Sequence, residues 1–358
     1  MTKDSIITNI SRLPAKHNRT LRAWNAADEY LLNYANDSSA TSITLYHDRF
    51  GFLGCNLQER TPEFVVERKS QLDALETNLQ KNKLGDIRTR TVLESGQSFD
   101  LALCSIPKSL ERFELYLQDA VRHATNKSTL VCAFMTKHFT KSWLTIASKY
   151  YSKVEQSMAV KKSRLLILSE PINSESVQPP TSTDIDLDGF TGQRFPGTFA
   201  GNKVDIATRF LLNNLPEFDN AKRVLDLGSG NGIIANTMKS KAAEEIHLVE
   251  DDYLSYESGK LNCSDSIYHH HWNYSLSDLD IQDFDVVVTN PPFHHGYEQD
   301  IEMAFNLFKE AHNILRSGGT LLIVANRHLN YRTQLSRYFS RVEVIKQNDK
   351  FEIIEATR

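Results

Sequence analysis

Short apolar runs alternate with helical segments along the second half of the chain. Between residues 300 and 315 the apolar side chains recur at helical spacing, and that segment ends at Ser317-Gly318-Gly319. Strands that are apolar on both faces and alternate with helices favour a parallel sheet covered on both sides. The pattern therefore predicts a doubly wound α/β domain. The apolar runs taken as its strands are residues 223–227, 245–249, 284–289 and 320–325.

The first half of the chain resembles a copy of the second half. The segment Phe99–Pro107 aligns without gaps against Phe284–Pro292. Several matches in the same order indicate a duplication, so we expect a second α/β domain at the N-terminus. Two further pairs of segments match in the same order: Thr129–Ala133 with Lys137-His138 against Thr320–Val324 with Arg327-His328, and Tyr151–Glu155 against Phe339–Glu343.

The two copies differ at the positions that carry chemistry. Asp226–Gly232 is rich in glycine, whereas the first copy has Asp48–Gly54 in its place. Where the second copy has Asn290-Pro291, the first has Ser105-Ile106. The sequence predicts that the first copy keeps the scaffold and has lost the chemistry.

A stretch rich in Pro, Ser and Thr separates the two copies and lacks apolar periodicity. It is typical of a linker or an extended segment. We therefore expect a first domain over residues 1–170, a linker over 171–195 and a catalytic domain over 196–358.

Composition changes this picture little. The 358 residues are 40% hydrophobic and 24% charged, which is typical of a globular protein, and no apolar run approaches a membrane span. The start of the chain has no secretory pattern, and the four cysteines have no CxxC spacing. These features predict a cytoplasmic protein with buried, unpaired cysteines and no membrane contact.

Charge is uneven along the chain. Residues 121–170 hold nine Lys or Arg against two acidic residues, which suggests a grip on an anionic partner, although a solvated helix face would look the same. The residues proposed for this grip are Lys137, Lys141, Lys149, Lys153, Lys161, Lys162 and Arg164.

The glycine-rich turn lies where a ligand binds in this class of fold. It follows the first strand of the second domain and opens a helix, and its glycines let backbone approach a ligand closely. Glu250 and Asp251 end the next strand, where a carboxylate can accept both hydroxyls of a ribose. The alternatives are a turn that only packs its helix and a solvated strand end. The residues assigned to this nucleoside site are Asp226, Gly228, Ser229, Gly230, Asn231, Gly232, Glu250 and Asp251.

Asn290-Pro291-Pro292-Phe293 is the strongest signal in the chain. It follows an apolar strand, so it projects at the same edge of the sheet. The Asn290 side chain and the Pro291 carbonyl can accept both N–H groups of an exocyclic amine, and Phe293 offers a face for stacking a base. Such positioning needs no metal and no covalent nucleophile. A plain strand-to-loop turn is the alternative.

These residues together resemble the S-adenosylmethionine-dependent methyltransferases that methylate amino groups. Asn290–His294 and Ala325–Leu329 are similar to the bacterial ribosomal RNA guanine-N2 methyltransferases of the RsmC/RlmG group. Leu21–Leu32 is similar to the members of that group that act on the large subunit. The resemblance covers nearly the whole chain.

The resemblance implies two tandem Rossmann-like (class I) methyltransferase domains, with the N-terminal one degenerate and helping to hold RNA. It implies that Asn290 also borders the cofactor, that Val204–Arg209 lies beside it, and that Asn273 or its neighbour Tyr274 contacts the adenine. The family usually has Cys at the position of Ser229, a change small enough for cofactor binding to continue.

The expected reaction is transfer of a methyl group from S-adenosylmethionine to the N2 amine of a guanine in 23S rRNA. Two classes of alternative remain. One is a methyltransferase that shares the motif but acts on another acceptor, namely DNA adenine N6, a protein glutamine or a guanine in 16S rRNA. The other is a non-catalytic RNA-binding factor that retains the fold. We expect a monomer without a metal. The runs His269-His270-His271 and His294-His295 are interpreted as surface clusters in loops, since adjacent histidines rarely converge on one ion. Arg327 and His328 follow a strand and are left between an RNA contact and a packing role.

Overall fold

The structure is a computed structural model that describes residues 6–13, 21–187, 190–199, 201, 203–218, 221–240, 243–291, 294–295, 298–299 and 301–358. The chain divides after Thr181 into two compact units. In the described part of the chain, no helix has the length and apolar character that a membrane crossing requires.

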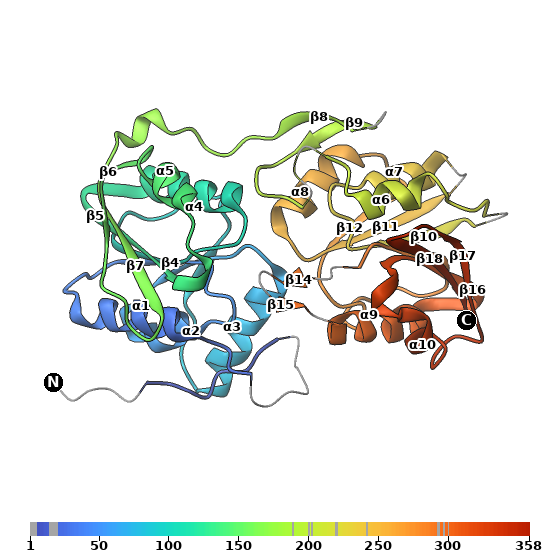
Figure 1. Cartoon of the computed structure of the whole chain (residues 1–358), viewed down its shortest axis with the longest axis horizontal. Coiled ribbons are helices and arrows are strands. Elements are labelled where there is room, and N and C mark those ends of the chain that lie inside the picture. The colour runs from blue at the N-terminus through green and yellow to red at the C-terminus, as the bar shows by residue number, and fades with distance from the viewer. Residues whose placement is uncertain are drawn as a thin grey trace. The chain divides into compact units, whose positions relative to one another are not determined.

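The first unit is one seven-stranded sheet with helices on both faces (Figure 1). Its strand order is β3-β2-β1-β4-β5-β7-β6, and β7 alone runs antiparallel to its neighbours. The strands are β1 (Ile43–Tyr46), β2 (Glu63–Val65), β3 (Arg88–Arg90), β4 (Phe99–Ser105), β5 (Ala124–Met135), β6 (Tyr151–Gln156) and β7 (Ser163–Pro171). The helices are α1 (Ala26–Asp37), α2 (Phe52–Asn56), α3 (Lys69–Lys81), α4 (Leu110–His123) and α5 (Lys141–Ala147), with short 3-10 turns η1 (Gln58–Arg60), η2 (Thr136–His138) and η3 (Ser174–Ser176).

The second unit repeats this architecture. Its sheet has the order β12-β11-β10-β13-β16-β18-β17. The strands are β10 (Arg223–Leu227), β11 (Glu245–Glu250), β12 (Tyr268–Trp272), β13 (Phe284–Thr289), β16 (Leu315–Asn326), β17 (Arg341–Gln347) and β18 (Phe351–Thr357). The helices are α6 (Ile206–Leu212), α7 (Ile233–Ser240), α8 (Tyr253–Asn262), α9 (Ile301–Ile314) and α10 (Tyr331–Leu335), with the 3-10 turn η4 (Arg327–Leu329). Two small hairpins complete it: β8 (Thr183–Leu187) with β9 (Phe190–Arg194), and β14 (His294–His295) with β15 (Glu298–Gln299).

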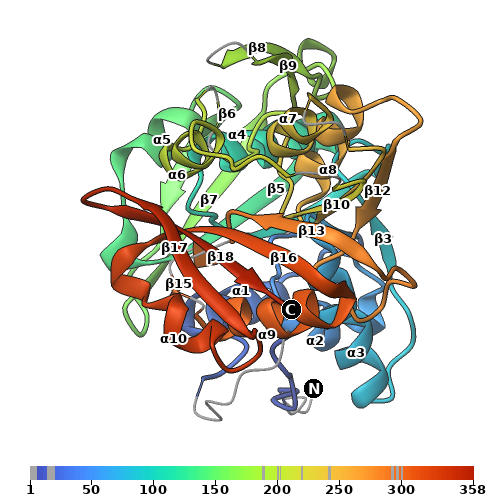
Figure 2. The ribbon, with the colours of Figure 1, turned by 90° about the vertical axis from the view of Figure 1, so that its right-hand side faces the viewer.

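Each face of the second sheet has its own apolar core. Side chains of α6 and α7 pack on one face around Val224, Val286 and Val288. Side chains of α9 and α10 pack on the other face around Leu225 and Val287. Figures 1 and 2 show the sheet between these two helical layers. Neighbouring residues of one strand thus face opposite cores, which is why these runs are apolar throughout.

The prediction of an α/β domain is confirmed, but the prediction that its sheet is purely parallel is wrong. β18 pairs antiparallel with both β16 and β17. The reason is local: β17 and β18 form a hairpin, and the chain's last strand inserts between β16 and β17. An apolar pattern marks burial on both faces and does not report strand direction.

The duplication is visible in the strand register. Leu101 pairs with Thr129 and Val286 pairs with Thr320, and both strand pairs carry an irregularity two residues earlier. Both units also tie the start of their fourth strand to their first in the same way. Asp100 accepts backbone N–H bonds from Thr41 and Ser42, and Asp285 accepts them from Lys222 and Arg223.

Two details of the sequence alignment are wrong. Leu45 lies opposite Leu103 in the first sheet, and Asp226 lies opposite Val288 in the second. Leu45 is therefore the structural equivalent of Asp226, and Asp48 lies further along the chain, beyond the end of β1. Met135 ends β5 as Asn326 ends β16, so Thr136 rather than Lys137 corresponds to Arg327. Short apolar strands align well, but loops between them differ in length.

The segment read from composition as a linker contains the β8–β9 hairpin. The side chain of Asn262 at the end of α8 accepts from Gln193 N at 2.7 Å and donates to Gln193 O at 2.8 Å. Phe195 N donates to Ser258 Oγ at 3.0 Å. These contacts attach the hairpin to α8, so residues 183–187 and 190–195 pack as part of the second unit.

Candidate cofactor and acceptor site

The glycine-rich turn joins β10 to α7 at the carboxyl edge of the sheet. Gly228, Gly230 and Gly232 all have positive φ, of 73°, 56° and 81°. A Cβ at Gly228 or Gly230 would meet no atom within 4 Å, whereas one at Gly232 would lie 2.8 Å from Cys263 Sγ. The first two glycines therefore leave an open cradle above the sheet, and the third permits close packing of α7 and α8.

Asp226 is fully buried beneath this turn. Its Oδ2 accepts from Ala235 N at 3.0 Å, while its Oδ1 is buried without a hydrogen-bond partner. Burial raises the pKa of Asp226 to about 7. A buried oxygen with no partner is costly unless something else bonds it, so Asp226 anchors the helix and leaves one acceptor open.

Glu250 ends β11 beside the turn. Its Oε2 accepts from Gly230 N and its Oε1 from Asp252 N, both at 2.8 Å. Burial, with Asp252 and Asp251 nearby, raises the pKa of Glu250 to about 7. Each carboxylate oxygen has a second lone pair, so Glu250 can still accept two hydroxyl groups.

Asn273 and Tyr274 follow the next strand, β12. Asn273 is 9% exposed, and its Oδ1 accepts from Tyr274 N at 2.8 Å and from Ser275 N at 3.3 Å. Asn273 N donates to Glu250 O at 3.0 Å, and Trp272 Nε1 donates to Asp251 O at 2.9 Å. Asn273 thus shapes the turn beside Glu250 and Asp251.

Asn290 follows β13, the strand next to β10, and is half-buried. Its Nδ2 donates to Asp205 Oδ2 at 3.0 Å and to Thr208 Oγ1 at 2.9 Å. Asp205 also caps α6 by accepting from Ala207 N and Thr208 N. Because the Asp205 carboxylate can only accept, the amide orientation is fixed with Nδ2 toward α6. No described residue donates to Asn290 Oδ1, which leaves that oxygen for another ligand.

Asp205 and Thr208 are missing from the site residues assigned from motifs. The segment Val204–Arg209 is identified by resemblance as bordering the cofactor, but no residue pattern reveals that its first turn holds Asn290. Pro291 is buried at the end of the same strand. Pro292 and Phe293 lie outside the described residues.

The equivalent edge of the first unit is filled by its own side chains. A Cβ at Gly51 or Gly54 would lie 2.9 or 2.8 Å from Leu75 Cδ1, so these glycines face packed atoms. His47 and Tyr116 bond the Glu67 carboxylate there. Ser105 takes the place of Asn290 and donates to Asp28 at 2.6 Å, on the helix that corresponds to α6. The first copy is therefore degenerate as predicted.

The interpretation of His269-His270-His271 as a surface loop cluster is wrong. These residues lie in β12, and His247 in β11 contacts His269 and His271 at ring-centroid distances of 4.7 and 5.1 Å. His247 bonds Glu245 Oε1 at 2.7 Å and His271 Nε2 at 2.9 Å. Nitrogen and oxygen atoms of Glu245, His247 and His269 lie within 4.8 Å of one another. The run of three histidines lacks the apolar pattern that predicts a strand, so an edge strand was not predicted there.

The basic residues of the first unit are mostly exposed, and Arg164 is half-buried. Three of the lysines form ion pairs: Lys149 with Glu114 at 2.9 Å, Lys153 with Glu155 at 3.1 Å and Lys161 with Glu29 at 2.8 Å. Thr136 N donates to Lys162 O, which joins η2 to the β6–β7 turn. Lys137 and Lys162 therefore lie at the carboxyl edge of this sheet.

Comparison with known proteins matches both units. Residues 2–173 match the RLMG N-terminal domain, and residues 190–355 match the Methyltransferase small domain. The ribosomal RNA large subunit methyltransferase G of Psychromonas ingrahamii is 31% identical over 98% of this chain and 96% of its own length. The protein of the same name from Ectopseudomonas mendocina is 33% identical over 97% of this chain and 96% of its own.

Among solved structures, a T. thermophilus 16S rRNA N2 methyltransferase (RsmC) in complex with AdoMet and guanosine superposes with a TM-score of 0.79. It is 21% identical and covers 94% of this chain and 93% of its own. That likeness shows the fold, two tandem methyltransferase-type domains. The first unit is degenerate, the glycine cradle of the second is open, and the sequence is 31% and 33% identical to the two large subunit enzymes over nearly its full length. The chain therefore belongs to the ribosomal RNA large subunit methyltransferase G family.

Proposed function

We propose that this protein transfers a methyl group from S-adenosylmethionine to the N2 amine of a guanine in 23S rRNA. The observation that carries the proposal is the orientation of Asn290. Its Nδ2 is committed to Asp205 and Thr208, so its Oδ1 is presented as an acceptor at the edge of the sheet. The relatives at 31% and 33% identity are named for the large subunit, which favours 23S over 16S rRNA.

The glycine turn and its carboxylates suit the cofactor. Gly228 and Gly230 leave room for backbone to approach a ligand, and Asp226 keeps a buried oxygen without a partner. Glu250 would accept the ribose hydroxyls, with Ser229, Asn231 and Gly232 completing the turn. Asp251 and Asn273 would border the adenine. S-adenosylmethionine, when bound, supplies an electrophilic methyl group on sulfur.

Asn290 and Pro291 would position the guanine amine. The N2 nitrogen of guanine carries two hydrogens, and its lone pair is delocalised into the ring. Acceptance of both hydrogens by Asn290 Oδ1 and the Pro291 carbonyl holds the lone pair toward the methyl group. The new N–C bond forms as the S–C bond breaks, and one N2 proton then leaves to water. Pro292 would restrict the backbone after Pro291, and Phe293 would stack on the base.

The first unit would hold the RNA. Phosphates of the RNA would be contacted by the basic segment of Lys137, Lys141, Lys149, Lys153, Lys161, Lys162 and Arg164. Residues 1–170 would thus bind the RNA, and residues 196–358 would carry out the methyl transfer. A base stacked in RNA must leave its stack to reach the acceptor site. Because bacterial ribosomes assemble in the cytoplasm, the proposal places this protein there, acting as a monomer.

The test is Asn290→Ala. We expect kcat for methyl transfer to unmodified 23S rRNA to fall at least about 100-fold, because the amine is no longer positioned. Binding of S-adenosylmethionine, measured by calorimetry, should stay within about threefold. Ser105→Ala is the matched control, because Ser105 holds the equivalent place in the degenerate unit. Full activity of the Asn290 variant would remove the proposed role.

A further inference from the structure

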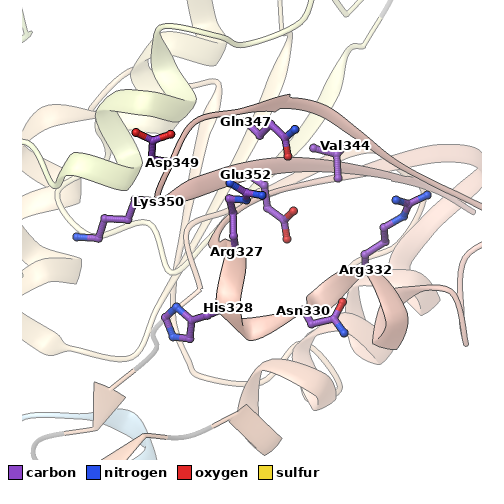
Figure 3. Close-up of a pocket in the computed structure, with 9 residues that line it drawn as sticks. All are labelled: Arg327, His328, Asn330, Arg332, Val344, Gln347, Asp349, Lys350 and Glu352. Atoms are coloured by element: carbon purple, nitrogen blue, oxygen red, sulfur yellow. The ribbon is translucent and has the colours of Figure 1, made fainter.

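A cavity of about 790 Å³ opens at the carboxyl edge of the second sheet. One wall comes from η4 and the start of α10, and the other from the turn between β17 and β18 (Figure 3). Its volume falls in the range of small-molecule sites, which is about 300–1,000 Å³. None of the residues that line it has been assigned to the cofactor or the acceptor above.

The cavity lies on the same edge as Asn290. β13 pairs with β16, where Thr289 is opposite Ile323, and β16 pairs with β18, where Asn326 is opposite Phe351. Two strand spacings separate β13 from β18, which is roughly 10 Å. The side chain of Phe210 in α6 stacks on Phe351 at 6.3 Å, and α6 is also the helix that holds Asn290. One helix thus supports both places.

Three cations line the cavity. Arg327, Arg332 and Lys350 are exposed and come from η4, α10 and the β17–β18 turn. Arg327 N donates to Lys350 O at 3.1 Å and Arg327 Nη1 donates to Asn348 O at 3.3 Å, which joins the two walls. Lys350 Nζ lies 5.0 Å from the Phe351 ring centroid. This framework holds the positive groups around one opening.

Glu352 lies on the floor of the cavity and is 9% exposed. Figure 3 shows its carboxylate directed into the cavity between Arg327 and Arg332. Among the described residues, none forms a hydrogen bond with this carboxylate. Burial raises the pKa of Glu352, and the two arginines oppose that shift. The carboxylate has no donor from the described protein and faces the open cavity, so it is free to accept a hydrogen bond from a ligand.

The charges also limit what fits. Three cations face two carboxylates, Asp349 and Glu352, so the cavity is not a simple anion trap. A ligand with both a phosphate and an N–H donor satisfies both sets of groups. In an RNA strand bound at Asn290, a neighbouring adenine, cytosine or guanine nucleotide has a phosphate and an amino group that donates two N–H bonds, whereas uracil has no amino group.

We infer that this cavity is a second nucleotide subsite, which holds a nucleotide flanking the methyl acceptor in the RNA. Arg327, Arg332 and Lys350 contact its phosphate, and Glu352 accepts a hydrogen bond from an amino group of its base. The inference rests on the proposed function for the identity of the RNA. It adds a specificity-determining residue, Glu352, to that function.

The first experiment removes one cation. Arg332→Gln should raise the KM for 23S rRNA about tenfold, with kcat within about twofold. It should also lower the slope of log K against log salt for binding of the RNA by about 0.7, the share of one phosphate. Arg337→Gln is the matched control, because Arg337 is exposed just beyond α10 and lies outside the cavity. Equal KM values and equal slopes for the two variants would overturn the phosphate contact.

The second experiment tests base recognition. After the acceptor is mapped, its neighbours are replaced one at a time in an RNA fragment that still accepts methyl groups. At one neighbouring position the natural protein should prefer adenine, cytosine or guanine over uracil, which has no amino group, by about fivefold or more in kcat/KM. Glu352→Gln should flatten that preference with an unchanged affinity for S-adenosylmethionine. A purely structural Glu352 would lower the melting temperature and leave the preference intact, which would overturn the inference.

The experiments distinguish a failure of the proposed function from a failure of the second nucleotide subsite. If the natural protein methylates no RNA, the proposed function fails, while the salt slopes of Arg332→Gln and Arg337→Gln still report whether the cavity binds phosphate. If the natural protein methylates RNA without any preference at the neighbouring positions, the proposed function stands and base recognition by Glu352 is refuted.

Discussion

Asn290 acts as a donor toward α6 and is thereby oriented as an acceptor toward the site. Thr208 Oγ1 is one of its two anchors, at 2.9 Å. Thr208→Val preserves shape and removes that acceptor. One hydrogen bond contributes about 1 kcal/mol, so we expect kcat to fall about fivefold to tenfold, with S-adenosylmethionine affinity unchanged. Thr237→Val, which removes a hydroxyl from α7, should leave kcat unaltered. A loss confined to KM would contradict the positioning role.

Binding of S-adenosylmethionine is expected to depend on pH through the carboxyl group of Glu250. Burial holds the pKa of its carboxyl at about 7, so the ionised acceptor is present above that pH and is lost as the pH falls through it. Affinity for S-adenosylmethionine should therefore weaken by up to about tenfold between pH 8 and pH 6. Glu250→Gln should bind weakly throughout and show a flatter profile, measured by calorimetry. Tighter binding at pH 6 than at pH 8 would contradict the assignment.

Within the glycine turn, one glycine is expected to matter for the stability of the fold and another for cofactor binding. Gly232→Ala places a Cβ 2.8 Å from Cys263 Sγ at a φ of 81°, so it should cost about 2–4 kcal/mol of unfolding free energy. Gly230→Ala meets no atom within 4 Å and should cost only the strain of its positive φ, about 1–2 kcal/mol. Its methyl group would instead fill the cradle and weaken cofactor binding at least about tenfold. Thermal unfolding and calorimetry on both variants check this, and a normal affinity in Gly230→Ala would refute the cradle.

Some strands could be predicted from the sequence alone, and others could not. The predicted strands over 223–227 and 284–289 coincide with β10 and β13, because burial on both faces leaves a plain apolar signature. The edge strand β12 was missed because two of its side chains, His269 and His271, stack on His247 rather than enter an apolar core. The support of Asn290 by Asp205 was missed because the two residues are 85 positions apart. Contacts of that kind depend on the fold and leave no local pattern.

For the whole molecule, duplication left one unit open to a ligand and the other closed. The same strand order supports both, but Leu75, His47 and Tyr116 fill the edge of the first. Cofactor binding is therefore expected at one site per chain. Calorimetry with the full chain should give a stoichiometry near one.

The first unit's contribution to RNA binding is expected to come from Lys137, Lys141 and Lys162, which form no ion pair with any described residue. A triple substitution of Lys137, Lys141 and Lys162 by Gln should reduce the slope of log K against log salt by about 2, at unchanged cofactor affinity. The control replaces Lys149, Lys153 and Lys161, which already pair with carboxylates. A larger effect from the control set would place the RNA elsewhere on this unit.

The central claim is methyl transfer to guanine N2 in 23S rRNA, and one measurement tests it directly. The protein is incubated with S-adenosylmethionine and separate unmodified pools of 23S rRNA, 16S rRNA, assembled subunits and DNA, and each pool is digested to nucleosides for mass spectrometry. If the protein has the proposed function, new N2-methylguanosine appears in 23S rRNA and none appears in 16S rRNA or DNA. N2-methylguanosine confined to 16S rRNA would contradict the substrate, and no methylated nucleoside in any pool despite cofactor binding would contradict the reaction.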